Sequence, residues 1–240
     1  MTTINVNAIE SSTSTLTIGE SGNSVVAADS VNVNLVKDAS GATMWQSNGS
    51  GVLSNVNSKF GDSLVLLSTQ SASSSASIEF TSGIDATYKE YVFQALDVIP
   101  ATDETRLQFE TSTDGGSTWG VTKTSATFRA EHDVAGSTTE LAYWIGIAEA
   151  TTAVTLTDFL GNVAPESGMA TVKLFNPAST TYVKNFYVET QSWTAGAGRN
   201  RSNNLLGGGY MNTTSAINAL RFKISSGNIA YGKFKMYGVK

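Results

Sequence analysis

Cysteine is absent from this chain of 240 residues, and histidine occurs only once. The lack of cysteine excludes disulfide frameworks, thiolate metal sites and cysteine nucleophiles together. No uncharged apolar run approaches the ~18 residues of a membrane span. The first residues also lack the cationic and apolar regions of a signal peptide. We therefore predict a protein that is made and folded in a cytoplasm and does not insert into a membrane.

The composition is that of a folded protein, since 40% of the residues are hydrophobic. A single domain of ~200 residues with a tail, or two small domains, fits this length. A chain of this size can bury a sizeable core without a structural metal or disulfide.

Charge is distributed unevenly along the chain. Residues 166–240 carry nine Lys or Arg and two acids, whereas residues 1–165 carry six Lys or Arg and eighteen acids. A basic patch for nucleic acid is one interpretation. There is, however, no basic run, and cations such as Lys173 and Lys223 alternate with apolar neighbours. We therefore expect solvent-facing strand residues and no nucleic-acid partner, and the opposite charges of the two parts also favour self-assembly.

Residues 1–58 differ from the rest because they contain one aromatic residue, Trp45, and many Ser, Thr, Asn and Gly. Short alternating pieces such as Leu16–Ile18 and Val31–Leu35 are separated by turn-forming residues. These pieces have too few large side chains to close a core within one chain. The segment is either disordered or wound together with other copies. Its regular spacing favours an N-terminal oligomeric β-strand or fibre-like segment that serves attachment and oligomerisation.

Residues 59–240 are predicted to form a jelly-roll-like β-sandwich domain, so the fold class is all-β. Eight or more short strands are separated by loops rich in Gly, Ser and Asp, and no helical period appears except for one possible turn at Ala86–Glu90. The serine-rich run Ser68–Ser77 is expected to be a loop or a small-residue edge strand. The expected strands include Leu64–Leu67, Ile78–Phe80, Tyr91–Phe93, Arg106–Phe109, Ala126–Phe128, Leu141–Ile145, Val154–Leu156, Ala170–Phe175 and Tyr182–Thr190.

The end of the chain predicts an amphipathic antiparallel pair of strands. Leu220, Phe222 and Ile224 alternate with cations, and Phe234 and Met236 do the same after a Ser-Gly-Asn turn. Alternation with period two places the apolar residues on one face of a sheet and the cations on the other. The turn supplies the positive φ that a chain reversal needs.

Ser112–Trp119 fits the pattern S-x-D-x-G-x-T-W and resembles the Asp-box of sialidases and other propellers. In those families the motif is a hairpin turn remote from the active site. It occurs once here, whereas a propeller repeats it in each blade. A sialidase also needs clustered arginines. The five arginines of the chain are Arg106, Arg129, Arg199, Arg201 and Arg221. The motif is therefore expected to be a structural turn.

The only histidine lies in Glu131-His132-Asp133. Neighbouring strand residues point to opposite faces, so these three cannot converge on a metal ion. The nucleophile elbow G-x-S-x-G is also absent. We expect His132 to lie in a loop at the end of a strand, and we predict no catalytic residue, no metal site and no cofactor.

The longest flexible loop candidate is Gly196–Asn204 followed by Gly207–Tyr210. Amides, guanidinium groups and aromatic faces are what a sugar-binding site uses, because sugars offer hydroxyls and apolar C–H faces. An ordinary surface loop is the alternative. The residues predicted to bind a ligand are Trp193, Arg199, Asn200, Arg201 and Tyr210.

Two long runs of sequence resemble known proteins. Residues 14–58 resemble N-terminal segments of fibre-like virion proteins of tailed phages, particularly marine ones. Residues 71–119, with 128–134 and 217–238, are similar to a jelly-roll-like domain that is common in such proteins. Members of this family are tail-fibre-like, head-fibre and capsid-decoration components, commonly trimers. The shared motifs mark strands and turns, so the resemblance implies a virion role without naming a catalytic residue.

The sequence thus leads to two functional hypotheses. The first is a non-enzymatic bacteriophage virion structural protein, a fibre-like or decoration component on the capsid or tail. Its partners would be further copies of itself in a trimer, other virion proteins and, if it acts in adhesion, a host-surface glycan. The second is a glycan-binding or glycan-cleaving module that shares the fold. The absence of a close acid pair with flanking aromatics weakens cleavage.

Overall fold

Two units make up the chain, Met1–Phe60 and Gly61–Lys240. The computed structural model describes residues 35–37, 40–47, 53–54, 63–194 and 200–240. The described strands of the first unit are β1 (Leu35–Lys37), β2 (Thr43–Ser47) and β3 (Leu53–Ser54), which pair antiparallel in the order β1-β2-β3. The predicted strand at Leu16–Ile18 and the predicted boundary at residue 58 lie outside the described residues.

The second unit is all-β, and its described residues form no helix. The segments predicted as strands overlap observed strands, but residues 201–211, most of which were predicted as loop, form a strand as well. The predicted helical turn at Ala86–Glu90 is wrong. Asp85 accepts a hydrogen bond from the backbone N–H of Thr87 at 2.8 Å, an Asx turn that competes with helix formation. The strands are β4 (Leu64–Ser75), β5 (Ser77–Phe80), β6 (Glu90–Pro100), β7 (Leu107–Ser112), β8 (Lys123–Asp133), β9 (Thr139–Ala150), β10 (Val154–Thr155), β11 (Gly168–Phe175), β12 (Lys184–Thr194), β13 (Arg201–Met211), β14 (Ala219–Ile224) and β15 (Ile229–Val239).

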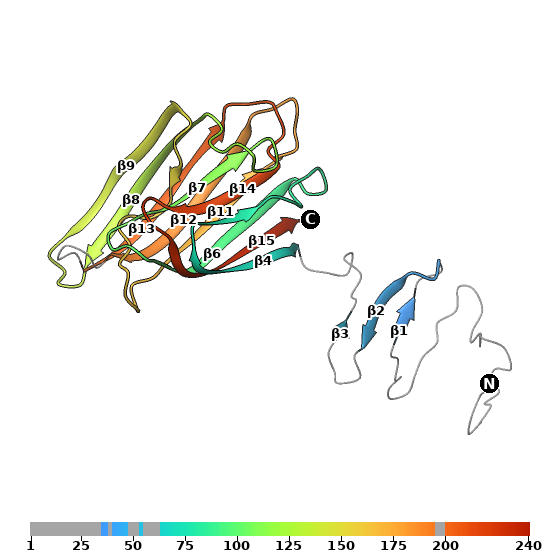
Figure 1. The fold of residues 1–240 in the computed structure, drawn as a ribbon, viewed down its shortest axis with the longest axis horizontal. Coiled ribbons are helices and arrows are strands. Elements are labelled where there is room, and N and C mark those ends of the chain that lie inside the picture. The colour runs from blue at the N-terminus through green and yellow to red at the C-terminus, as the bar shows by residue number, and fades with distance from the viewer. Residues whose placement is uncertain (1–34, 38–39, 48–52, 55–62, 195–199) are drawn as a thin grey trace, which may run out of the picture. The chain divides into compact units, whose positions relative to one another are not determined.

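These strands form two antiparallel sheets in a β-sandwich-like arrangement (Figure 1). The larger sheet has eight strands in the order β4-β15-β6-β11-β12-β13-β8-β9, and the smaller has four in the order β10-β7-β14-β5. The serine-rich strand β4 is one edge of the larger sheet, which confirms the small-residue edge strand predicted there, and β9 is the other edge.

The two closing strands do not pair with each other, so the predicted antiparallel pair is wrong. β14 pairs with β5 and β7 in the smaller sheet, whereas β15 pairs with β4 and β6 in the larger one. The Ser226-Gly227-Asn228 turn, with φ of +79° at Gly227, therefore carries the chain from one sheet to the other. The predicted faces are nevertheless confirmed, because all five apolar residues of the two strands are buried. These are Leu220, Phe222, Ile224, Phe234 and Met236.

Aromatic contacts between the sheets mark the centre of the core. Phe222 of β14 meets Phe234 of β15 with ring centroids 5.3 Å apart. Phe109 of β7 likewise meets the ring of Phe186 of β12 edge to face at 5.4 Å. Offset and edge-to-face geometries are those that aromatic pairs prefer. The apolar core lies between β7, β14 and β5 on one side and β15, β6, β11 and the first half of β12 on the other.

Candidate functional site

Most of the predicted ligand loop is strand. β12 and β13 form a long hairpin, in which Trp193 pairs with Ser202 and Thr194 with Arg201. Arg199 lies outside the described residues. The glycines at 207–209, which favoured a loop in the sequence, stand in the middle of β13. A Cβ on Gly209 would clash with the backbone oxygen of Thr124 in the neighbouring strand β8, so close strand packing explains this glycine.

Tyr210 does not belong to the same site as Trp193, and that part of the prediction is wrong. Tyr210 pairs with Asn185 and Thr124 at the opposite end of the hairpin. Nine residues of extended strand separate it from Arg201, which is roughly 30 Å at ~3.3 Å per residue.

Trp193 and Asn200 do lie together, on the outer face of the larger sheet. The indole Nε1 of Trp193 donates a hydrogen bond to Asn200 Oδ1 at 2.6 Å. The backbone oxygen of Asn200 accepts one from Val134 N at 3.0 Å. Arg201 follows Asn200 directly, so its side chain projects to the inner face instead. The predicted set is therefore split between the two faces of the sheet.

On the inner face Arg201 joins two other arginines around an open cavity of about 360 Å³, which we call the arginine cavity. Its walls come from both sheets: β8, β9 and β13 of the larger one, and the segments next to β7 and β10 of the smaller one. The lining residues are Arg106, Arg129, Trp144, Asp158, Phe159 and Arg201.

Carboxylates form ion pairs with all three arginines. Glu131, a buried residue of β8, lies between two of them, with Oε1 2.7 Å from Arg201 Nη1 and Oε2 3.2 Å from Arg129 Nε. Arg129 also reaches Glu140 at 2.7 Å and Asp158 at 3.3 Å. Buried ion pairs of this kind add little net stability, but they fix the position of the charged groups. Arg129 is thereby held by three acids from two sheets.

Arg106 is held differently, mainly by aromatic rings. Its guanidinium carbon lies 3.9 Å from the ring centre of Phe159 and 5.7 Å from that of Trp144. Its one ion pair, to Asp158, is long at 3.5 Å, and its Nε has no hydrogen-bond partner among the described residues. A cation over an aromatic face is attracted by the ring quadrupole. The Nε of Arg106 is buried, so only its terminal nitrogens can face the cavity, and a third of its side chain is exposed.

The interior beside the cavity is unusually polar. Asn203 of β13 stands opposite Glu131 and Ser192 in the register of the sheet and is fully buried. Neither its amide nitrogen nor its oxygen has a hydrogen-bond partner in the described part of the chain. The same holds for the hydroxyls of Thr190, Ser192 and Thr194 on β12. Buried polar groups normally have partners, so these four side chains are an exception within the sandwich interior, and none of them lines the arginine cavity.

The sequence analysis missed this site. The three arginines and two aromatic residues come from five separate segments, and each arginine alone looks like a strand cation. The sequence analysis named five arginines without grouping any of them, whereas Arg106, Arg129 and Arg201 line one cavity in the structure. A signal was present in the alternation of Arg129, Glu131 and Asp133 in β8, since period two places charges on the inner face of that strand.

The Asp-box-like segment is a turn, as predicted. Asp114 Oδ1 accepts hydrogen bonds from Ser112 Oγ at 2.6 Å and from the Thr118 backbone N–H at 2.8 Å. These hydrogen bonds, the one from Ser112 foremost, lower the pKa of Asp114 to about 2. The ring of Trp119 is covered by the guanidinium of Arg221, whose central carbon lies 4.6 Å from the ring centre. The acid and the indole of this motif are thus used within the fold.

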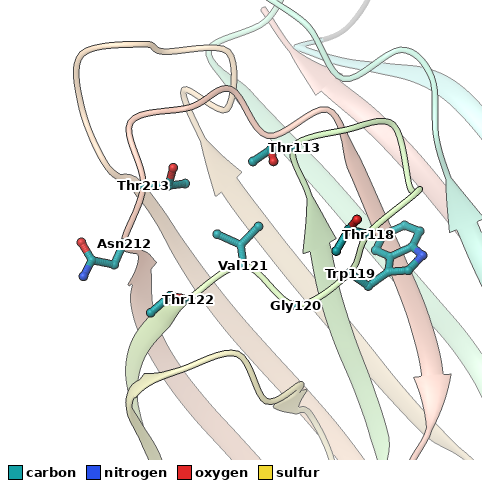
Figure 2. A pocket seen from close by; sticks show the side chains of 8 residues that line it. All are labelled: Thr113, Thr118, Trp119, Gly120, Val121, Thr122, Asn212 and Thr213. Carbon is teal, nitrogen blue, oxygen red and sulfur yellow. The ribbon is translucent and has the colours of Figure 1, made fainter.

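A second cavity, of about 330 Å³, lies beside this turn (Figure 2). In Figure 2 the Trp119 ring is at one end and Asn212 at the other, with threonine side chains between them. No lining residue carries a charge, so this hollow offers only hydroxyl and amide groups. The lining residues are Thr113, Thr118, Trp119, Gly120, Val121, Thr122, Asn212 and Thr213.

The segment around the histidine confirms the alternation argument. Glu131 faces inward to the arginines, whereas His132 is exposed and its Nδ1 lies 2.7 Å from the backbone oxygen of Asp133. Asp133 accepts a hydrogen bond from the Ser137 backbone N–H at 2.7 Å and so closes the β8–β9 turn. The three residues do not converge. His132 itself lies within β8 rather than in a loop.

Two lysines are buried at the opposite end of the same strands. Lys123 Nζ donates to the Thr152 backbone oxygen at 2.8 Å, and Lys184 Nζ donates to that of Tyr182 at 2.9 Å. Burial lowers the pKa of Lys123 to about 8 and also lowers that of Lys184. These amines line neither the arginine cavity nor the cavity of Figure 2.

Within the described ranges no three His, Asp or Glu side chains gather as metal ligands would. The same ranges hold no helix long and apolar enough to cross a membrane. Comparison of the chain with protein-family models, with curated proteins and with solved structures finds no match.

Proposed function

We propose that this chain is a non-enzymatic structural protein of a tailed-bacteriophage virion, a fibre-like or decoration component displayed on the capsid or tail. The observation that carries the proposal is the resemblance of residues 14–58 and 71–119 to such proteins. The finer description of the sandwich as jelly-roll-like belongs to the same proposal. Its support is the all-β second unit with two antiparallel sheets.

The use of the acidic side chains supports a role without catalysis. Asp114 and Asp133 close turns, while Glu131 and Asp158 are tied to arginines. A glycosidase needs one carboxyl group free to give a proton and a second that acts on the sugar. Around the arginine cavity, the carboxylates instead position cations.

The edge strand β9 supports a homo-oligomer, for which we propose a trimer. On its outer face Leu141 and Tyr143 are 74% and 69% exposed, and Tyr143 pairs with Phe128, which is 47% exposed on β8. A long apolar edge strand is a liability for a lone molecule because its backbone groups can pair with another chain. A second copy, or another virion protein, would cover this edge.

The test is proteomics of purified particles of the phage that encodes the chain. We expect the protein to remain with the particles through gradient purification and nuclease treatment. Hundreds of copies per particle would place it on the head, and a few to a few dozen would place it on the tail. Absence from the particles would contradict the proposal.

A second measurement tests the oligomer. Light scattering of the full chain is expected to give the mass of three copies, and the double variant Leu141→Ser, Tyr143→Ser is expected to lower it. A monomeric wild type would contradict the oligomer, while an unchanged mass in the variant would exclude β9 as its interface.

The second candidate function is glycan recognition, and the arginine cavity is the observation that favours it. Positioned cations next to aromatic faces are suited to binding sugars rather than cleaving them. Glycan recognition is compatible with a virion role, since a surface protein that binds a host glycan acts in adhesion.

A further inference from the structure

We propose that the arginine cavity binds a carboxylate-bearing sugar, with Arg106 and Arg201 as the groups that contact the carboxylate. This inference goes beyond the virion role, because a particle protein can function with or without such a site. It rests on the cavity residues Arg106, Arg129, Trp144, Asp158, Phe159 and Arg201.

Ion pairs already fix the positions of the guanidinium groups that would bind the anion. Glu131 and Asp158 are almost fully buried, with side chains 3% and 6% exposed, and they hold the arginines on the protein side. The side chains of Arg106 and Arg201 are 33% and 29% exposed on the cavity side. A planar guanidinium binds a carboxylate with two parallel hydrogen bonds. Because the arginines are already fixed, little side-chain entropy is lost when an anion binds.

The balance of charge favours a carboxylate over a phosphate. The three arginines are matched by Glu131, Glu140 and Asp158, and Asp158 itself lies on the cavity wall. A doubly charged phosphate would meet this carboxylate at close range, and like charges repel strongly in a partly desolvated site. A singly charged carboxylate is attracted to the arginines at a smaller cost.

The rest of the lining favours a sugar as the carrier of the carboxylate. Trp144 and Phe159 flank the Arg106 guanidinium and line the cavity with apolar ring atoms, against which the C–H groups of a pyranose can pack. A volume of about 360 Å³ is near the lower end of the range for small-ligand sites. We therefore expect a single sugar residue rather than an extended chain.

The experiment is titration calorimetry of the full chain with two acid sugars and their methyl esters. The probes are the methyl glycosides of N-acetylneuraminic acid and of galacturonic acid, which separate sialic from uronic acids. Each ester removes the charge of its acid and adds one methyl group. We expect at least one acid to bind at least about tenfold more tightly than its ester, the equivalent of about 1.4 kcal/mol. The affinity should fall as salt is raised.

Variants assign the binding to the cavity. Arg106→Gln removes an arginine that has one long ion pair, so the fold should be retained, and we expect affinity to fall about tenfold or more. Arg221→Gln is the matched control. Arg221 is also ion-paired, to Glu110 at 2.7 Å, and stacked on an aromatic ring, but it does not line the cavity. We expect it to leave affinity unchanged.

Three outcomes would overturn the inference in a protein whose circular dichroism shows it folded. The first is no binding of either acid at about 10 mM, a concentration that reveals even weak single-site affinities. The second is equal binding of acid and ester. The third is an equal loss of affinity in Arg106→Gln and Arg221→Gln, which would indicate binding elsewhere.

Discussion

The two halves of strand β12 face the same interior with opposite chemistry. In the first half Phe186 and Val188 belong to the apolar core. In the second half Thr190, Ser192 and Thr194 take the same inward positions, equally buried, with hydroxyls that lack partners among the described residues. Apart from the terminal Lys184, the first half of β12 therefore contributes apolar side chains to the interior, whereas the second half contributes hydroxyls.

The difference shows that one strand can contribute both to the stability of the sandwich and to the positioning of charged groups. The apolar half obtains its stability from the burial of large side chains. The polar half forgoes much of that stability, because an unpaired buried hydroxyl costs free energy. What it gains is a rigid setting for charged groups such as Arg129 and Glu131. Departures from an apolar interior are commonly found at functional sites.

The largest effect is expected in the apolar half. Phe222→Ala removes a ring that packs on Phe234 across the sheets, and we expect a loss of about 3–5 kcal/mol in the free energy of unfolding. Lys223→Ala is the control. Its partly exposed amine lies 3.8 Å from Glu110, and such pairs contribute about 0–1 kcal/mol. Urea denaturation measures both, and equal effects would contradict the assignment of the two faces.

Gly209, which pairs with Phe186 in the apolar half of β12, tests the close packing of β13. Gly209→Ala places a Cβ against the backbone of Thr124, which cannot rotate away, and we expect a loss of about 1–3 kcal/mol. Gly208→Ala is the matched control, because its Cβ would meet the Phe186 backbone oxygen at 3.1 Å, a milder contact. Thermal unfolding of the two variants compares them, and a larger loss at 208 would disprove the strand register.

Exchanging an apolar and a polar residue on β12 tests the difference between its two halves directly. Val188→Thr buries a new hydroxyl and should cost about 1–3 kcal/mol. Thr190→Val removes a buried hydroxyl without a partner and should be neutral or stabilising by up to about 1 kcal/mol. The two changes are nearly isosteric and lie two residues apart on one strand. If Thr190→Val destabilises the protein as much as Val188→Thr does, the polar half is hydrogen-bonded, for example through water.

The dependence of stability on pH tests the buried lysines. The pKa of Lys123 is lowered from 10.5 to about 8 in the folded chain. Between these values the unfolded chain binds a proton that the folded chain does not, so stability should rise as pH increases from about 8 towards 10. Above pH 10 the raised pKa of Tyr91 acts in the opposite sense, because the unfolded chain then loses its tyrosine proton first.

Urea denaturation at about pH 7.5 and about pH 9.5 measures this rise. Lys123→Met should flatten it, and Lys184, whose pKa is also lowered, accounts for any remaining rise. A rise of the same size in wild type and Lys123→Met would exclude Lys123 as the cause.

Local patterns in the sequence located the strands and their buried faces, but they did not identify the partners of those strands. Alternation placed Phe222 and Phe234 on inner faces, yet a turn of the same composition can join strands within one sheet or between two. Gly207–Gly209 indicated a loop, because glycine is permissive and its close-packing role depends on a neighbouring strand. The sequence analysis did not predict the arginine cavity, because its residues come together only when distant strands pair.

The place of β15 in its sheet has a consequence for biosynthesis. This last strand lies between β4 and β6, the first and third strands of its unit, and Val239 pairs with both Leu64 and Glu90. Until β15 leaves the ribosome, the facing edges of β4 and β6 have no partner between them. A domain in which a strand must pair with strands far from it in the sequence folds slowly. The unpaired edges of those earlier strands stay exposed until the pairing strand has been synthesised. We expect a nascent chain stalled before residue 229 to remain protease-sensitive, and the sandwich to form only once residues 229–239 can pair with β4 and β6.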